Sequence, residues 1–488
     1  MSKKIETMDR NNSIYGKILL WTPILLLLAG CAGMDENPVN ADPQDKGESQ
    51  EKVSSSLKVS IMSAPADAAA DDSNLDVNIV DFMAYVFDSS TGLLDITFGM
   101  DKDRNPLGAA ENITGTAGGG IEVSTSAVTV GRKDILVLAN LGTYSGRQGV
   151  TGLEYPAVTE GLTSIFDMNG KVCTVGSMKD LIYDGATAMP LTTDGTVSVT
   201  VQPNVANTAA VPLVRPLARY SLAVDPRQSE KENSIYGYID GAAVYKPVSM
   251  PKSFYLLPEI KNGDWTVPDY GTAFAQDRYM SSQYYSDDTA AGSEIHYLTE
   301  NRAQDNVAGN TSAVMVKTTF RPRELYDQNG QNKIIWDGQK YNYASTGGIY
   351  DGGQNGELPA AAPDTGGEAK PTFWRLVSND GTSWGVIYFY QKPADTYYDT
   401  ANWTAVPYYG RVCYYRINFR DPSQTDEYSV QRNRWFNVNI VSCSGAGFDT
   451  EDGAISRDPS DPAQETTVGV TFTVSDWKND NEIPDIEL

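Results

Sequence analysis

Histidine is nearly absent from this sequence. The one histidine among 488 residues, His296, is flanked by Ile295 and Tyr297, which offer it no catalytic partner. Catalysis of the Ser-His-Asp type would need that residue, and metal sites built from several histidines are excluded. No nucleophile motif or phosphate-binding loop is present either. The sequence therefore favours a protein that is not an enzyme and that carries no cofactor and no metal.

Cysteine is almost as scarce, with four residues at positions 31, 173, 413 and 443. No Cys-x-x-Cys motif occurs, so a structural zinc site is not expected. Cys413 and Cys443 could meet on neighbouring strands, but spacing alone does not show whether they pair. That question stays open at this stage.

The sequence also lacks a long apolar run. The longest, residues 18–28, is short for a membrane span and is broken by Pro23. Basic residues precede it, and Leu28-Ala29-Gly30-Cys31 follows. This order predicts a lipoprotein signal peptide at residues 1–30, cut before Cys31, whose thiol then carries lipid. The alternative is an ordinary signal peptide with a chance cysteine; in both cases the mature chain is exported.

Positive charge is in short supply. The chain has 38 basic and 63 acidic residues, a net charge of −25. Such an acidic exterior repels nucleic acid and anionic membrane surfaces, so nucleic acid is not an expected partner.

Alternation of apolar and polar residues recurs along most of the chain and predicts strands. It begins at residues 55–62, where Leu57, Val59 and Ile61 give one apolar face. A polar stretch at residues 31–54 comes before and is expected to be a flexible, lipid-anchored tether. An exposed spacer rich in Ala and Asp comes after; it contains Ala64, Asp67 and Asp72. The first strand should therefore be attached to its domain only by pairing.

The predicted fold class is all-β, in two domains. Residues 135–140 are apolar on both faces, as in a central sandwich strand. A charged, polar stretch follows Pro226 and is typical of a domain boundary. We therefore predict an N-terminal β-sandwich at residues 55–226 and a C-terminal one at 227–488, with long loops in the second.

Two further features of the sequence bear on other kinds of site. Asp327 opens a stretch that departs from a calcium loop, with Asn332 at its sixth position and Gly338 at its twelfth, so a turn is favoured. Tyrosine pairs could line a sugar-binding surface, although tyrosine is also ordinary in strands. These pairs are Tyr284-Tyr285, Tyr397-Tyr398 and Tyr408-Tyr409. A lipid-anchored glycan-binding protein therefore remains an alternative.

Eight segments, in order along the chain, carry a family resemblance. They are the lipobox ending at Cys31, LKVSIM (57–62), VFDSSTG (86–92), GRKDILVLANLG (131–142), Met189-Pro190-Leu191, VRPLARYSL (214–222), Thr299-Glu300-Asn301, and the stretch from Cys413 to Gly447. Together they resemble the fimbrillins of Bacteroidales, the lipoprotein-derived subunits of type V pili. The nearest likeness is to the shaft subunit of the minor fimbrium.

The resemblance implies a fold and a way of assembly. The fold is two tandem transthyretin-like β-sandwiches. A lipidated precursor reaches the outer membrane with its first strand completing its own N-terminal sheet, a surface protease cuts behind that strand, and a strand of another subunit fills the groove. Repetition gives a surface filament for adhesion and biofilm. By this likeness Leu57, Val59 and Ile61 plug the groove, and Ile483, Ile486 and Leu488 belong to the candidate donor strand.

One departure affects the expected role. Well-known members of the family are cut after an arginine just beyond the first strand, whereas the spacer here has no Arg or Lys, and the first arginine after Cys31 is Arg104. A different protease cuts near Ala64, Asp67 or Asp72, or the chain is never cut. We expect a shaft subunit, with an anchor or tip subunit as the alternative; its partners are further copies of itself and other fimbrial subunits.

Overall fold

The computed structural model describes residues 53–62, 79–116, 120–142, 149–158, 164–176, 188–224, 236–272, 275, 278–280, 296–303, 308–360, 370–381, 383–455 and 468–476. All the strands below belong to one compact unit, Lys52–Leu488. Several residues named above lie outside the described ones: Cys31, Ala64, Asp67, Asp72, Ile483, Ile486 and Leu488.

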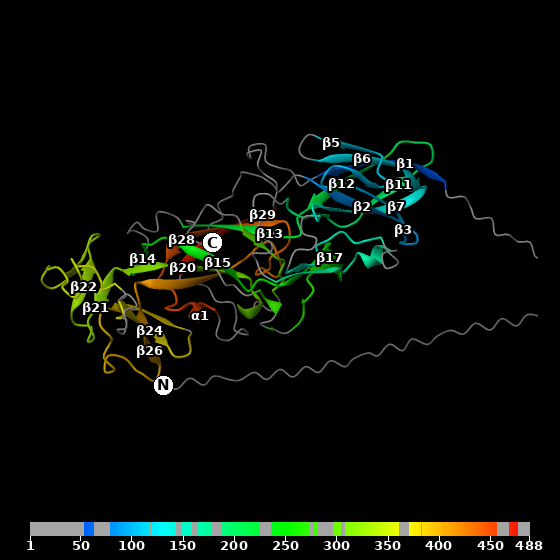
Figure 1. The fold of residues 1–488 in the computed structure, drawn as a ribbon. Helices are drawn as coiled ribbons and strands as arrows, with labels where there is room; N and C mark the ends of the chain where they lie inside the picture. The colour runs from blue at the N-terminus through cyan, green and yellow to red at the C-terminus, as the bar shows by residue number, and fades with distance from the viewer. Residues whose placement is uncertain are drawn as a thin grey trace, which may run out of the picture. The chain divides into compact units, whose positions relative to one another are not determined.

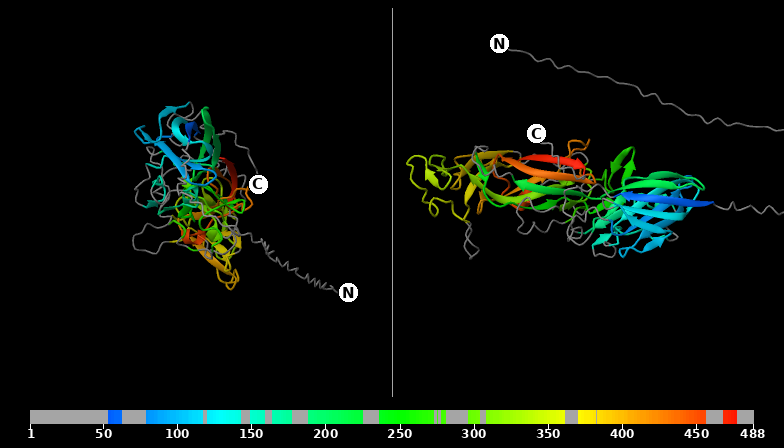
Figure 2. Two further views of the ribbon diagram at one scale, coloured as in Figure 1. Left: turned by 90° about the vertical axis from the view of Figure 1, so that its right-hand side faces the viewer. Right: turned by 90° about the horizontal axis from the view of Figure 1, so that it is seen from above.

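The first part of the fold is a ten-stranded sheet in the order β4-β3-β2-β7-β10-β12-β1-β6-β5, with β11 paired to β7. Its strands are β1 (Ser54–Met62), β2 (Phe82–Asp88), β3 (Leu94–Met100), β4 (Pro106–Gly108), β5 (Asn112–Gly115), β6 (Ile121–Thr129), β7 (Gly131–Ala139), β10 (Leu191–Thr193), β11 (Val197–Val201) and β12 (Asn207–Val214). The sheet is folded into a sandwich, with β1, β5 and β6 on one side and β2, β3 and β7 on the other (Figure 1). In Figure 2, β1 is the dark blue strand among the cyan ones.

The second part contains two four-stranded sheets and one six-stranded sheet. The first four-stranded sheet has β19 (His296–Leu298), β13 (Ala218–Val224), β28 (Arg434–Cys443) and β29 (Val468–Asp476); the other has β14 (Gly237–Ile239), β20 (Ala313–Pro322), β15 (Val244–Val248) and β27 (Val412–Asn418). The six-stranded sheet has β23 (Tyr341–Tyr343), β22 (Lys333–Trp336), β21 (Glu324–Tyr326), β25 (Trp384–Phe389), β24 (Phe373–Ser378) and β26 (Trp403–Tyr408).

Smaller elements complete the described fold. They are β8 (Val150–Thr151), β9 (Val172–Val175), β16 (Ser253–Tyr255), β17 (Glu259–Lys261), β18 (Asp264–Thr266), the 3₁₀ turns η1 (Ile165–Asp167) and η6 (Ala308–Asn310), and the short helix α1 (Glu451–Ala454). None of the helices in the described part of the chain is long and apolar enough to cross a membrane.

Two large apolar cores explain why some strands alternate and others do not. Strand β1 alternates because only its odd-numbered side chains are buried, in the core of the N-terminal sandwich. Residues 82–87 of β2 and 135–139 of β7 are apolar because their two faces enter different cores. For example, Ile135 and Val137 enter the first core and Leu136 the second. The interpretation of residues 135–140 as a central strand is confirmed.

The two parts repeat one strand arrangement. Strand β1 runs parallel to β12 and antiparallel to β6, and β13 runs parallel to β28 and antiparallel to β19. The predicted all-β class built from β-sandwiches is confirmed. The domain limits at 55–226 and 227–488 stay predictions; β13, just before Pro226, pairs with β19 and β28 of the second part.

The three described cysteines, Cys173, Cys413 and Cys443, are buried free thiols. Cys413 and Cys443 are therefore not paired in this structure.

Candidate functional site

The first strand lies inside a sheet, between two partners. On one side β1 pairs in parallel with β12, which places Leu57 opposite Asn207, Val59 opposite Ala209 and Ile61 opposite Val211. On the other side it pairs antiparallel with β6, which places the same three residues opposite Thr125, Val123 and Ile121. We call the space that β1 occupies between β12 and β6 the β1 groove.

The inward side chains of β1 fill this groove completely. Leu57 and Val59 have no solvent exposure and Ile61 has 1%. Fully burying an aliphatic side chain of this size stabilises a fold by about 1.5–3 kcal/mol. The structure thus brings together the three residues predicted to plug the groove, and each of them contributes to the core of the N-terminal sandwich.

The other face of β1 is open to solvent. Ser56, Lys58 and Met62 on this face are exposed. Lys58 Nζ lies 2.6 Å from Glu122 Oε2 on β6, and this contact lowers the pKa of the Glu122 carboxyl. An exposed ion pair of this kind adds little stability. Main-chain pairing and the three inward side chains therefore provide most of the stabilisation of β1 in the sheet.

Asn207 is a polar residue at the inner wall of the groove. Its Nδ2 donates to the carbonyl oxygen of Ser56 over 2.9 Å and to that of Gln202 over 3.0 Å. Its Oδ1 accepts from the Gln202 main-chain N–H over 2.9 Å. Ser55 Oγ also donates to the Gln202 carbonyl, over 2.9 Å. These contacts fix the start of β1 against the start of β12.

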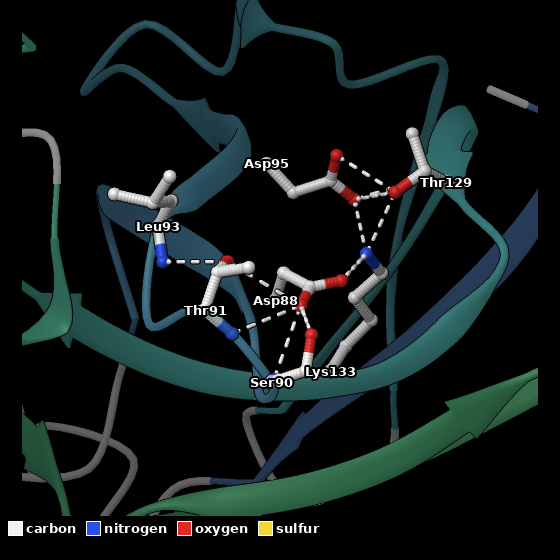
Figure 3. A network of polar contacts seen from close by, with 7 residues as sticks. All are labelled: Asp88, Ser90, Thr91, Leu93, Asp95, Thr129 and Lys133. Atoms are coloured by element: carbon white, nitrogen blue, oxygen red, sulfur yellow. Dashed lines mark hydrogen bonds and ion pairs between the residues drawn. The ribbon is translucent and has the colours of Figure 1, made fainter. Parts of the chain in front are cut away.

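A buried lysine braces the neighbouring end of β6 (Figure 3). Lys133 Nζ on β7 lies 3.1 Å from Asp88 Oδ2 and 3.1 Å from Asp95 Oδ2, and it donates to Thr129 Oγ1 over 2.7 Å. The Lys133 side chain has no solvent exposure. Since Thr129 pairs with Ser54, this network fixes the end of the groove at which β1 begins.

Within the same network, the pKa of Asp88 is lowered well below its ordinary value. The largest cause is the hydrogen bond from the Ser90 hydroxyl, and the Lys133 ammonium adds to it. Burial of the carboxyl acts in the opposite direction but is outweighed. Asp88 is therefore a carboxylate at neutral pH, and it compensates part of the buried charge of Lys133.

Three of the family motifs meet in the second part of the fold. Arg432 Nη2 lies 2.6 Å from Glu300 Oε2, and both side chains are buried. The Asn433 main-chain N–H donates to the carbonyl oxygen of Leu217 over 2.8 Å, in the short link from β12 to β13. These contacts join three motifs close to the link between β12, a wall of the groove, and β13. The motifs are Thr299-Glu300-Asn301, VRPLARYSL and the stretch from Cys413 to Gly447.

The tyrosine pairs differ in what the structure leaves accessible. Tyr408 is fully buried, and its hydroxyl donates to the Gly447 carbonyl over 2.6 Å. Tyr397 and Tyr409 are exposed. Tyr284 and Tyr285 lie outside the described residues. Among the four tyrosines of these pairs that the structure describes, Tyr408 is therefore unavailable to a ligand at the surface.

The Asp327 segment is a turn, as predicted. The Asp327 carboxylate accepts hydrogen bonds from the main-chain N–H groups of Asn329 and Gln331 and from the side-chain amide of Asn332. Among the described residues, no group of three or more His, Cys, Asp or Glu is placed to hold a metal ion.

Sequence reasoning missed Asn207 and Lys133. The sequence does contain a signal for Asn207. This residue occupies an inward-facing position of β12, and the other inward-facing positions are apolar: Ala209, Val211 and Leu213. A polar residue in that phase must find buried partners. The partners of Lys133 lie on three other strands, and local pattern does not show such contacts.

The fold and the β1 groove define a class: β-sandwich proteins whose N-terminal sheet is completed by their own first strand. A family model matches the C-terminal part of the sequence. Residues 407–482 match the family described as "Major fimbrial subunit protein type IV, Fimbrillin, C-terminal". The resemblance to the fimbrillins is thereby confirmed, and it is this C-terminal region that carries the match.

Several solved structures are similar at low sequence identity. Fimbrilin FimA of Porphyromonas gingivalis W83 has 12% identity and a TM-score of 0.43, over 88% of this chain and 99% of that one. The tip fimbrial protein Mfa3 of P. gingivalis has 10% identity and a TM-score of 0.35, over 87% and 100%. A fimbrial assembly protein of Parabacteroides distasonis has 12% identity and a TM-score of 0.33, over 56% and 86%. No curated protein sequence matches significantly.

Proposed function

We propose that this protein is a structural subunit of a surface fimbrium and that it polymerises by exchange of β1 for a strand of another copy. The observation that carries the proposal is the position of β1 between β12 and β6, with three apolar side chains inward and its outer face open. Removal of β1 would leave two rows of unpaired main-chain groups around an apolar trough. Such a trough is a strong template for an added strand.

Exchange is energetically feasible because the incoming strand restores the side-chain burial and the main-chain hydrogen bonds that are lost when β1 leaves. The loss of Leu57, Val59 and Ile61 from the core costs about 1.5–3 kcal/mol for each side chain. A donor with the same alternation recovers that burial and the main-chain hydrogen bonds with both walls. Asn207 also serves any donor, because it binds a main-chain carbonyl.

The remaining steps of the proposal rest on the sequence. The chain is exported and carries lipid on Cys31 at the outer membrane, and a surface protease cuts in the spacer that holds Ala64, Asp67 and Asp72. The donor strand is the tail with Ile483, Ile486 and Leu488. The shaft position is favoured because the sequence of this tail carries spaced apolar residues; an anchor or tip position is the alternative, since the spacer lacks a basic residue.

A disulfide lock tests the exchange directly. Lys58 on β1 and Ser124 on β6 are register partners, at a spacing that two cysteines can bridge. The double variant Lys58→Cys/Ser124→Cys is expected to form no filaments when oxidised and to regain assembly on reduction. The matched control, Asn112→Cys/Ser124→Cys, joins β5 to β6 at another register pair and should assemble in both states. Normal assembly of the oxidised Lys58/Ser124 variant would contradict the proposal.

A further inference from the structure

We propose that the outer face of the six-stranded sheet binds a neutral polysaccharide, which stacks on the rings of Tyr326, Trp374 and Tyr397. The site is separate from the β1 groove, whose walls β6 and β12 belong to a different sheet. Strands β21, β22, β24 and β26 of the six-stranded sheet lie together in Figure 1.

The six-stranded sheet is inserted between two strands that already pair with each other. Strands β20 and β27 are antiparallel register partners as far as Thr319 and Val412. Such a pair needs only a connection of a few residues. The chain instead leaves β20 at Pro322 and forms strands β21 to β26 before β27 begins. The inner face of the inserted sheet enters the apolar core through Leu325 and Tyr388, which leaves the outer face for another role.

A row of residues in register crosses the outer face. From β22 to β26 its members are Lys333, Tyr326, Phe389, Trp374 and Pro407. The row points outward because successive side chains of a strand alternate between faces, and the neighbours Leu325 and Tyr388 point into the core. Tyr326 and Trp374 are half-buried and lie two strands apart, which separates them by roughly 10 Å.

The third ring, Tyr397, packs on the middle of this row. The ring centroids of Tyr397 and Phe389 are 5.1 Å apart in an edge-to-face arrangement. Phe389 has no solvent exposure, whereas Tyr397 is 38% exposed. A Cβ atom at Gly330 would lie 2.5 Å from Cε2 of Tyr397, so the ring is also in contact on a second side. A ring that is already held in place loses little conformational entropy when a ligand binds.

Charged groups lie beside the rings without covering them. Lys333 Nζ is 2.5 Å from Glu324 Oε2 and 5.6 Å from the centroid of the Tyr326 ring. Lys392 Nζ is 6.0 Å from the centroid of the Trp374 ring. Both distances are near the limit of a cation–π contact. The ammonium and carboxylate groups can therefore bind sugar hydroxyls, while the rings accept the apolar face of a pyranose.

The charge of the molecule favours a neutral ligand. With a net charge of −25 the chain repels polyanions and further copies of itself. The charges at the site also balance, because Lys333 pairs with Glu324 and the exposed loop residues Lys392 and Asp395 have opposite signs. A neutral polysaccharide meets no such repulsion, and a chain of several sugars can reach both Tyr326 and Trp374.

Affinity electrophoresis of the full chain tests the site. The gels contain dextran, mannan or xyloglucan as neutral probes, or polygalacturonate as a polyanion. At least one neutral polysaccharide should retard the protein. Trp374→Ala and Tyr397→Ala should each weaken that binding about three- to tenfold, because each removes one stacking ring. Phe166→Ala removes a 75% exposed ring from η1 in the first part of the fold and should leave binding unchanged.

Thermal unfolding shows whether each variant is folded, and Tyr397→Ala, at an exposed loop position, replaces Trp374→Ala if that variant is not. Retardation by none of the neutral polysaccharides, or by polygalacturonate alone, would overturn the site, as would binding that survives both substitutions. Filament assembly should be unchanged in both variants, since the β1 groove is intact. A loss of assembly in Tyr397→Ala would assign this face to a contact between copies and would also overturn the site.

Discussion

The side-chain amide of Asn207 donates to the main-chain carbonyl of Ser56 over 2.9 Å. These residues are far apart in sequence, and their contact fixes the register in which β1 enters the sheet. Because Asn207 binds the main chain and not a side chain, it selects a position for the strand without selecting its sequence. A groove that exchanges one strand for another needs this kind of contact.

Replacement of Asn207 by leucine is expected to destabilise the full chain by about 1–3 kcal/mol. The change leaves the carbonyl groups of Ser56 and Gln202 without this donor in a partly buried setting. Urea unfolding at neutral pH measures the loss. Asn112→Leu, at an exposed amide on β5, is the control and should stay within about 0.5 kcal/mol of the unmodified protein. Equal effects of the two changes would contradict the assigned role.

Truncation of Leu57 tests how much β1 contributes to the core. Leu57→Ala should cost about 2–5 kcal/mol, because it opens a cavity beneath a fully buried position. Lys58→Ala, one residue on and facing outward, should cost at most about 1 kcal/mol, since it removes only an exposed ion pair. Denaturant unfolding of both variants gives the comparison. A Leu57→Ala variant as stable as Lys58→Ala would show that β1 is not packed as described.

The pKa of Asp88 predicts a dependence of stability on pH. Its pKa is lower in the folded than in the unfolded protein, where a value of about 3.9 is expected. The stabilisation is therefore fully present above about pH 4 and is lost as the pH falls through the folded pKa. Asp88→Asn should lower the free energy of unfolding at pH 7 by about 1–3 kcal/mol. It should also reduce the further loss of stability as the pH falls. Unfolding curves between pH 2 and pH 7 measure both effects.

The control for that series is Asp103→Asn, a change at an exposed carboxylate near the same sandwich. It should leave the pH profile of the unmodified protein in place. A profile for Asp88→Asn that still falls as steeply at acid pH as that of the unmodified protein would show that the Lys133 network does not govern acid stability.

The ion pair of Glu300 with Arg432 should be essential for the second part of the fold. Glu300→Gln keeps the shape but leaves the Arg432 charge buried without its anion, at a cost of about 3–5 kcal/mol. Glu427→Gln breaks the partly exposed pair with Arg420 and should cost about 0–1 kcal/mol. Calorimetry of both variants separates the two cases. A small effect at Glu300 would mean that this pair contributes no more than a surface pair.

The sequence indicated the elements of the groove but not their partners. Alternation at Leu57, Val59 and Ile61 predicted the inward face of β1, and the continuous apolar run of β7 predicted burial on both faces. Alternation indicates which face of a strand is buried, but it does not indicate which distant strand pairs with that strand. The pairing of β1 with β12 therefore required the structure.

The same reasoning explains the polar contacts that the sequence did not predict. Asn207, the Lys133 network and the Glu300–Arg432 pair all join residues from separate strands or loops. A buried charge is tolerated only when its partner is in place, and the partner is set by the tertiary fold. Family motifs marked Glu300 and Arg432, while nothing in either motif alone showed that they form one ion pair.

The departure of β1 is tested most directly by the N-terminal residue of the subunit in sheared surface filaments, read by mass spectrometry. The account predicts a first residue between positions 64 and 75, with residues 54–62 missing from the incorporated chain. Filament subunits that still begin at a lipidated Cys31 and retain residues 54–62 would contradict it.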